Sequence, residues 1–150
     1  MRWVRRERGT EVQALAVVPG TEFELQLPPT TGSYRIWARK QLVWEKSWLG
    51  DQEGGIPPYF VLTAHLRVNS SGVELLAGEF EERGASHRVQ RGSVGLGQVR
   101  GSCQHRLTDI PKAPGAVQVR GVLHAKRVAA DRPAHLEQVW IVVSERNEPG

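Results

Sequence analysis

Cys103 and His105 are the side chains of this 150-residue chain whose types and spacing come nearest to covalent chemistry. They are two positions apart, so a β-strand would place the thiol and the imidazole on one face. That is the beginning of a nucleophile–base pair, which also needs an orienting group and a site for the developing negative charge. The sequence indicates neither. We therefore interpret the two residues as a free thiol beside a surface histidine, and we assign no catalytic residue and no cofactor.

Metal ligands are not suggested by local spacing either. The histidines are scattered along the chain as His65, His87, His105, His124 and His135, and no two of them form the close pairs typical of zinc sites. Asp51 and Glu53 offer alternating carboxylates in a loop rich in Gly and Pro, but calcium takes about six to eight oxygen ligands from several segments. The sequence predicts no metal site. Cys103 with His105, or these loop carboxylates, are the groups that an enzyme would use.

Aromatic and basic side chains form a second candidate site. Arg35, Trp37 and Arg39 share one parity of an alternating run, and Trp48 follows shortly after it. Trp and Arg are enriched at the energetic centres of protein interfaces. We predict that these four residues bind a protein partner or a second copy of the chain. The alternative is that Trp37 covers the edge of a core and the Arg side chains lie over it.

Positive charge is concentrated in the second half of the chain. Residues 83–132 hold ten Lys and Arg against two Asp, a net of +8, although the whole chain is only +4. Such a region can attract an anionic polymer, either polysaccharide or nucleic acid. The predicted polyanion-binding residues are Arg88, Arg91, Arg100, Arg106, Arg120, Lys126 and Arg127. The alternative is that strands expose these side chains, which then pair across the sheet with Glu74, Glu79, Glu81 and Glu82.

The elements that carry these residues are expected to be strands. Residues 22–27 alternate strictly, with Phe23, Leu25 and Leu27 on one parity and polar side chains on the other. Similar runs recur along the chain, separated by Gly, Pro, Asn and Ser, and helical periodicity is almost absent. This pattern predicts an all-β fold: a two-sheet antiparallel β-sandwich of jelly-roll or immunoglobulin-like type, with about 7–9 strands and little helix.

Several local features refine this expectation. Pro19 and Gly20 predict a type II turn, and Lys40 interrupts an apolar parity, so we expect a bulge or a strand edge near it. Glycines make residues 86–107 irregular, residues 106–115 should be a connection because of two prolines, and residues 125–131 could form one helical turn. Residues 139–143 are apolar on both parities, as in a strand covered on both faces.

Length and composition fit one domain. We assign residues 11–145 to the sandwich, residues 1–10 to a basic N-terminal arm and residues 146–150 to a tail. With 39% hydrophobic residues, a chain of this size can bury a core without disulfide or metal. The single cysteine favours a reducing compartment, and we expect the cytoplasm. The N-terminal segment lacks the apolar run of a signal peptide, and no run is long enough for a membrane helix.

These observations together predict a non-catalytic β-sandwich that serves as a protein interaction or assembly module. Polyanion binding through the basic segment is the alternative, and an enzyme using Cys103 and His105 or the loop carboxylates is the third possibility.

Overall fold

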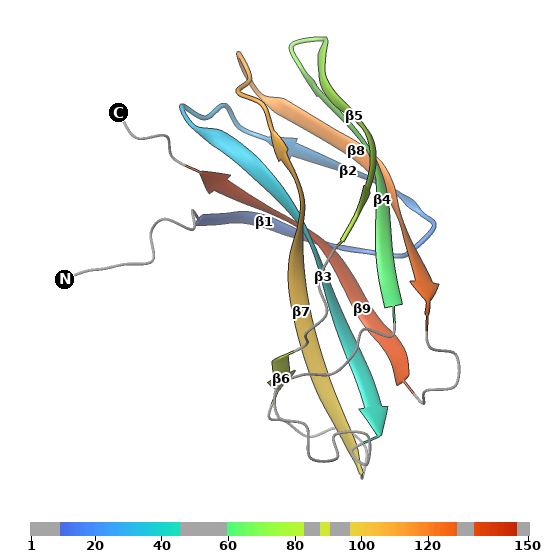
Figure 1. Cartoon of the computed structure of the whole chain (residues 1–150). Coiled ribbons are helices and arrows are strands. Elements are labelled where there is room, and N and C mark those ends of the chain that lie inside the picture. The colour runs from blue at the N-terminus through green and yellow to red at the C-terminus, as the bar shows by residue number, and fades with distance from the viewer. Residues whose placement is uncertain (1–9, 46–59, 83–87, 91–96, 129–133, 147–150) are drawn as a thin grey trace, which may run out of the picture.

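The structure, a computed structural model, describes residues 10–45, 60–82, 88–90, 97–128 and 134–146, and these residues form two antiparallel sheets (Figure 1). Sheet A has the order β1-β9-β3-β7-β6, and sheet B has the order β2-β8-β4-β5. The strands are β1 (Thr10–Val17), β2 (Glu22–Leu27), β3 (Ser33–Glu45), β4 (Phe60–Ser70), β5 (Val73–Glu81), β6 (Arg88–Gln90), β7 (Gln98–Ile110), β8 (Val117–Arg127) and β9 (Ala134–Arg146). The predicted β-sandwich is confirmed. Within these ranges there is no helix, and hence none that could cross a membrane.

The strand pairs are nested along the chain. β1 pairs with β9, β2 with β8, β3 with β7 and β4 with β5, all antiparallel. This is the pairing of one long antiparallel hairpin whose tip is the β4–β5 turn. Rolling that hairpin places β3 beside β9 and β4 beside β8, which completes the two sheets. The arrangement is a jelly roll, one of the two sandwich types that the sequence predicted.

The core lies between the sheets and is built by the predicted parity. The burial of β2 alternates strictly, with Phe23, Leu25 and Leu27 facing inward. On β3 the inward face includes Ile36 and Ala38, which are fully buried. Because alternate strand residues face opposite sides, the other parity of every strand lies on an outer face of the sandwich.

Two turns follow the chemistry of their residues. Gly20 has a φ of 86°, and the Thr21 amide donates to the Val18 carbonyl at 3.0 Å, as in the predicted type II turn. Ser71 and Gly72 both have positive φ, with angles of 51° and 78°, at the tip of the β4–β5 hairpin. That conformation is typical of a two-residue hairpin turn.

The second half of the chain is more regular than predicted. Residues 98–110 form a 13-residue strand, β7, where we expected an irregular segment and then a connection from residue 106. β7 pairs with β3 along its whole length, so ladder hydrogen bonds compensate for its weak local pattern. The helical turn predicted for residues 125–131 is also wrong, since residues 125–127 pair with β4 as part of β8.

Lys40 lies on the inward face of β3 and is almost completely buried, with 1% of its surface exposed. Its Nζ donates to Oε1 of Glu82 and to the carbonyl of Phe60. The Leu62 amide donates to the same carboxylate oxygen at 3.0 Å. Because these partners belong to the segments of sheet B, the ion pair joins the two sheets.

The irregularity expected near Lys40 lies beside it. Lys40 itself stays in register with both neighbouring strands, and the pairing of β3 with β9 shifts between Gln41 and Leu42. The sequence located the disturbance but not its cause. A charged side chain can stay inside the sandwich here because a carboxylate and a carbonyl satisfy it.

Replacing Lys40 by methionine should lower the free energy of unfolding by about 3–5 kcal/mol, because the Glu82 carboxylate is left buried without its cation. The double variant Lys40→Met with Glu82→Leu should recover most of that loss, since no buried charge remains. Urea denaturation of the three proteins measures the effect. Lys126→Met, at an exposed lysine of β8, is the matched control. A loss below about 1 kcal/mol for Lys40→Met would contradict the buried ion pair.

Candidate functional site

The predicted partner-binding residues lie on the outer face of sheet A. Arg35 lies directly opposite Ser144, Trp37 opposite Val142, and Arg39 opposite Trp140 in the pairing of β3 with β9. Residues directly opposite one another in an antiparallel pair point to the same side of the sheet. The fold therefore brings Trp37 and Trp140 together on one face. We call this surface, formed by the outward residues of β1, β9, β3 and β7, the tryptophan face.

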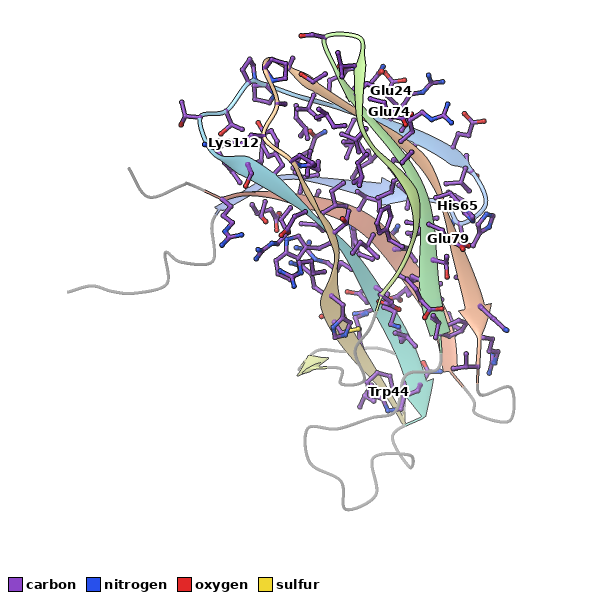
Figure 2. All side chains as sticks on the ribbon, turned by 45° about the horizontal axis from the view of Figure 1, so that its top comes forward. Glu24, Trp44, His65, Glu74, Glu79 and Lys112 are labelled. Carbon is purple, nitrogen blue, oxygen red and sulfur yellow. The ribbon has the colours of Figure 1, made fainter. Side chains whose placement is uncertain are left out.

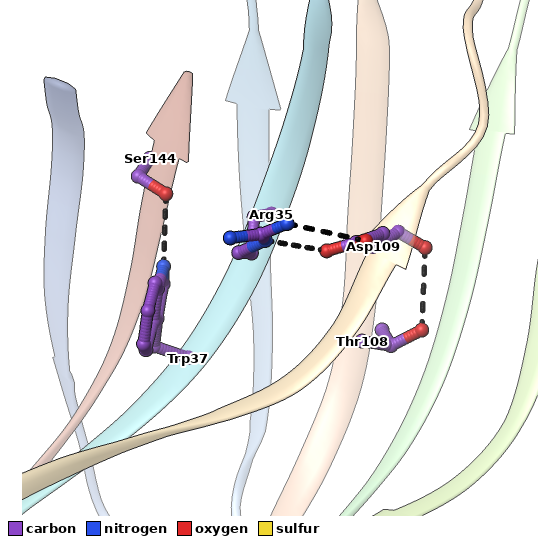
Figure 3. Close-up of polar contacts among 5 residues, drawn as sticks. All are labelled: Arg35, Trp37, Thr108, Asp109 and Ser144. Atoms are coloured by element: carbon purple, nitrogen blue, oxygen red, sulfur yellow. Dashed lines mark hydrogen bonds and ion pairs between the residues drawn. The ribbon is translucent and has the colours of Figure 1, made fainter. Parts of the chain in front are cut away.

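The centre of the tryptophan face is apolar. Trp37 is partly buried, and its Nε1–H donates to Oγ of Ser144 at 2.8 Å, which satisfies the indole N–H (Figure 3). Val142 is only 1% exposed although it points away from the core. Such burial on an outer face requires cover from neighbouring large side chains, and Trp37 lies directly opposite. The expectation that residues 139–143 are covered on both faces is borne out at this position.

Arginines surround this centre in fixed positions. Arg35 Nε lies 2.6 Å from Oδ1 of Asp109 (Figure 3). Arg39 donates from Nη2 to Oε1 of Glu11 at 2.7 Å and from Nε to Oε1 of Gln104 at 2.9 Å. Its guanidinium carbon also lies 5.8 Å from the centroid of the Trp140 ring, within the range of a cation–π contact. The side chains of Arg35 and Arg39 are 17% and 28% exposed, so part of each remains available to a partner.

Of the four residues predicted to bind a partner, Arg35, Trp37 and Arg39 come together on one surface. Trp48 lies outside the described residues. Sequence reasoning missed Trp140, which is partly exposed beside Arg39. Trp140 belongs to segment 139–143, which is apolar on both parities of the strand. That pattern does not indicate which of its residues share a face with β3.

The predicted polyanion-binding residues that are described divide between the two faces of the sandwich. Arg100 and Arg106 belong to the tryptophan face, whereas Arg120 and Lys126 lie on the outer face of sheet B. Arg127 is at the end of β8, with its guanidinium carbon 5.6 Å from the centroid of the Phe60 ring. Arg88 belongs to the edge strand β6, of which only the backbone is described. Arg91 is outside the described residues. Polyanion binding through one continuous patch stays a prediction.

Acidic neighbours neutralise part of this charge. Arg100 Nε lies 2.7 Å from Oε1 of Glu137, and this hydrogen bond raises the pKa of Arg100 and lowers that of Glu137. Arg120 is 3.8 Å from Oε1 of Glu24. Arg100 is therefore paired with a carboxylate of sheet A, whereas Arg120 has only a long contact. Neither partner is one of the residues that the alternative named, Glu74, Glu79, Glu81 and Glu82.

Cys103 and His105 lie on the same face of β7, as their spacing predicted, and that face is the inward one. Cys103 lies opposite Lys40, and His105 lies opposite Ala38. His105 is partly buried, and its Nε2 is buried without a hydrogen-bond partner, so it is not the surface histidine that we expected. Burial raises the pKa of Cys103 to about 12, with Lys40 opposing and Glu82 adding to the shift.

A thiol with so high a pKa is un-ionised at neutral pH, and the thiolate is the nucleophile. Across the described ranges, no three residues among His, Cys, Asp and Glu are grouped so as to hold a metal ion. Asp51 and Glu53 fall outside those ranges. The geometry therefore gives the tryptophan face more support as a functional site than it gives the Cys103 region.

Comparisons with known proteins do not assign this chain to a family. No family model matches the chain, and no curated protein matches it. Among solved structures, one similarity is to a chain in the structure of infectious bursal disease virus, Gt strain, with 10% sequence identity and a TM-score of 0.18. The match covers 92% of this chain and 38% of the viral chain. A similarity of this level carries no argument about fold or function.

Cys103 should react slowly with a thiol reagent in the folded protein. At pH 8 we expect native alkylation about a thousandfold slower than that of the urea-unfolded chain, because a thiol pKa raised from 9.0 to about 12 lowers the thiolate fraction by that factor. The folded state also keeps the thiol protonated up to a higher pH than the unfolded state does. The free energy of unfolding should therefore fall as pH rises above 9.0 toward about 12. Stopped-flow alkylation with and without urea measures the first effect. Equal rates in the two states would contradict the buried thiol.

Proposed function

We propose that this chain is a non-catalytic assembly module that binds a second copy of itself through the tryptophan face. The observation that supports this most is the pair Trp37 and Trp140, both partly exposed around the buried Val142 on a sheet face that no other described layer covers. Rigid aromatic rings with Arg around them are the composition of interface hot spots. The sheet surface offers them already ordered, so little conformational entropy is lost on binding.

The charges of this face favour a second copy as the partner. Arg35, Arg39 and Arg100 are already paired with Asp109, Glu11 and Glu137. When two identical faces meet, these three arginines are therefore already neutralised. A two-fold symmetric contact also places each patch against its own equivalent, which suits a surface that carries both signs.

Polyanion binding is the second candidate function, and one residue of the same face favours it. Arg106 is exposed and lies opposite Trp37 in the pairing of β3 with β7. A chain that binds a polyanion through Arg106 would be retained on heparin at low salt and released steeply as salt rises. Self-association through aromatic side chains would depend less on salt.

Ala16→Glu should abolish self-association, because it adds a charge to an exposed position of β1 opposite Trp140. Ala77→Glu makes the same change at an exposed position of β5 on the far face and is the matched control. Sedimentation velocity over a concentration series measures the outcome. We expect the sedimentation coefficient of the original chain and of Ala77→Glu to rise with concentration, and that of Ala16→Glu to stay at the monomer value.

A clean monomer up to about 1 mM would mean association weaker than about 4 kcal/mol and would contradict the proposal. Equal loss of association in Ala16→Glu and Ala77→Glu would place the contact elsewhere. Heparin retention by a chain that remains monomeric would favour the second candidate.

A further inference from the structure

The outer face of sheet B contains a shallow hollow that the proposed assembly does not use. It has a volume of about 530 Å³ and crosses all four strands of the sheet. Among its lining residues are Glu22, His65, Arg67, Glu79, Arg120 and Val122. The hollow is lowest at its centre because Val122 and Ala77, which point outward there, have short side chains.

Beneath the hollow, the backbones of β8 and β4 approach each other closely at Gly121. A Cβ at Gly121 would lie 2.3 Å from the His65 carbonyl oxygen and 3.0 Å from Leu66 Cδ2. Neighbouring strands therefore approach at this point in a way that only glycine permits. The strand backbones form the floor of the hollow, and exposed side chains of all four strands form its walls.

Two arginines lie directly opposite one another beside this hollow. Arg67 of β4 is paired in register with Arg120 of β8, so both side chains point outward from the same row. Like charges directly opposite in a sheet destabilise it. A sequence that breaks such a local rule often does so at a functional site.

Neither arginine has a tight partner. Arg67 Nε is 3.5 Å from Oε1 of Glu74, and Arg120 Nε is 3.8 Å from Oε1 of Glu24. Their side chains are 68% and 57% exposed. On the tryptophan face, by contrast, Arg35 and Arg100 hold carboxylates at 2.6 and 2.7 Å.

Glu24 is engaged mainly by amides, not by Arg120. Gln118 and Gln26 donate to its Oε2 at 3.0 and 2.6 Å, and these hydrogen bonds are the main cause that lowers the pKa of Glu24. The guanidinium of Arg120 consequently keeps its terminal nitrogens available. Two such planar donors side by side match the oxygens of a carboxylate or a sulfate.

The other side of the hollow offers acceptors. His65 Nε2 lies 3.3 Å from Oε2 of Glu79, and Glu22 is opposite Val122 on the edge strand β2. Figure 2 shows His65, Glu79, Glu74 and Glu24 along the same outer side of sheet B. Carboxylates at this position accept hydrogen bonds from hydroxyl groups and repel a second anionic group. A polyphosphate or nucleic acid strand is therefore disfavoured.

We infer that this hollow binds an acidic sugar: a polyhydroxylated ring that carries one carboxylate or sulfate. Arg67 and Arg120 would form ion pairs with the anionic group. The ring hydroxyls would form hydrogen bonds with Glu22, Glu79 and His65. The volume lies within the range of ligand sites in proteins and accommodates a sugar ring. The inference does not rest on the proposed assembly, which uses the opposite face of the sandwich.

The test is a titration of the ¹⁵N-labelled chain with glucuronate, followed by two-dimensional NMR. We expect saturable shifts of the amide signals of β4, β5 and β8 around the hollow. Glucose, which lacks the anion, and inorganic sulfate, which lacks the ring, should each bind about tenfold more weakly. Arg67→Gln and Arg120→Gln should each weaken glucuronate binding by about tenfold, and Arg100→Gln, on the opposite face, should not change it.

Several results would overturn the inference. They are the absence of saturable shifts with glucuronate, equal binding of sulfate and glucuronate, or equal effects of Arg120→Gln and Arg100→Gln. Both arginines of the pair are exposed, so their glutamine variants should fold, and unchanged amide signals of β1 and β3, in the other sheet, would confirm it. Since the self-association test reads a different face, its failure leaves this result unaffected.

Discussion

Every strand of a two-sheet sandwich has only two faces, and this constraint governs the rest of the molecule. One parity of each strand is used in packing the sheets together, so polar chemistry is confined to the two outer faces and to a few buried groups between the sheets. The nested pairing of the rolled hairpin then decides which distant residues share an outer face. It places Trp37 beside Trp140 on sheet A and Arg67 beside Arg120 on sheet B.

The two outer faces differ in how closely their arginines contact carboxylates. On sheet A, arginines hold carboxylates at 2.6–2.7 Å and leave an ordered, aromatic surface. On sheet B, the corresponding contacts of Arg67 and Arg120 lengthen to 3.5 and 3.8 Å around a hollow. The first arrangement suits a large complementary surface, and the second suits a small anionic ligand. One ion pair, Lys40 with Glu82, lies between the sheets and joins them. It is near Cys103, and burial keeps the thiol of Cys103 protonated.

The sequence alone was sufficient for the fold class and for strands with strict alternation. β2 was predicted at residues 22–27 and is observed there, because period-two burial is a local signal. The partners of the functional side chains were not predictable. Glu11 is 28 positions from Arg39, and Glu82 is 42 positions from Lys40, so only the strand register brings them together. β7 was misjudged because its stability depends on pairing with β3 and not on its own residues.

The most direct test of the central proposal is a concentration series of the tryptophan indole signals in ¹H–¹⁵N NMR spectra. If the tryptophan face joins two copies, the Trp37 and Trp140 signals should shift and broaden together as concentration rises. Trp44, which is 1% exposed in the interior, should stay unchanged and serves as the internal reference. Indole signals of Trp37 and Trp140 that do not move from dilute to millimolar protein would contradict the proposal.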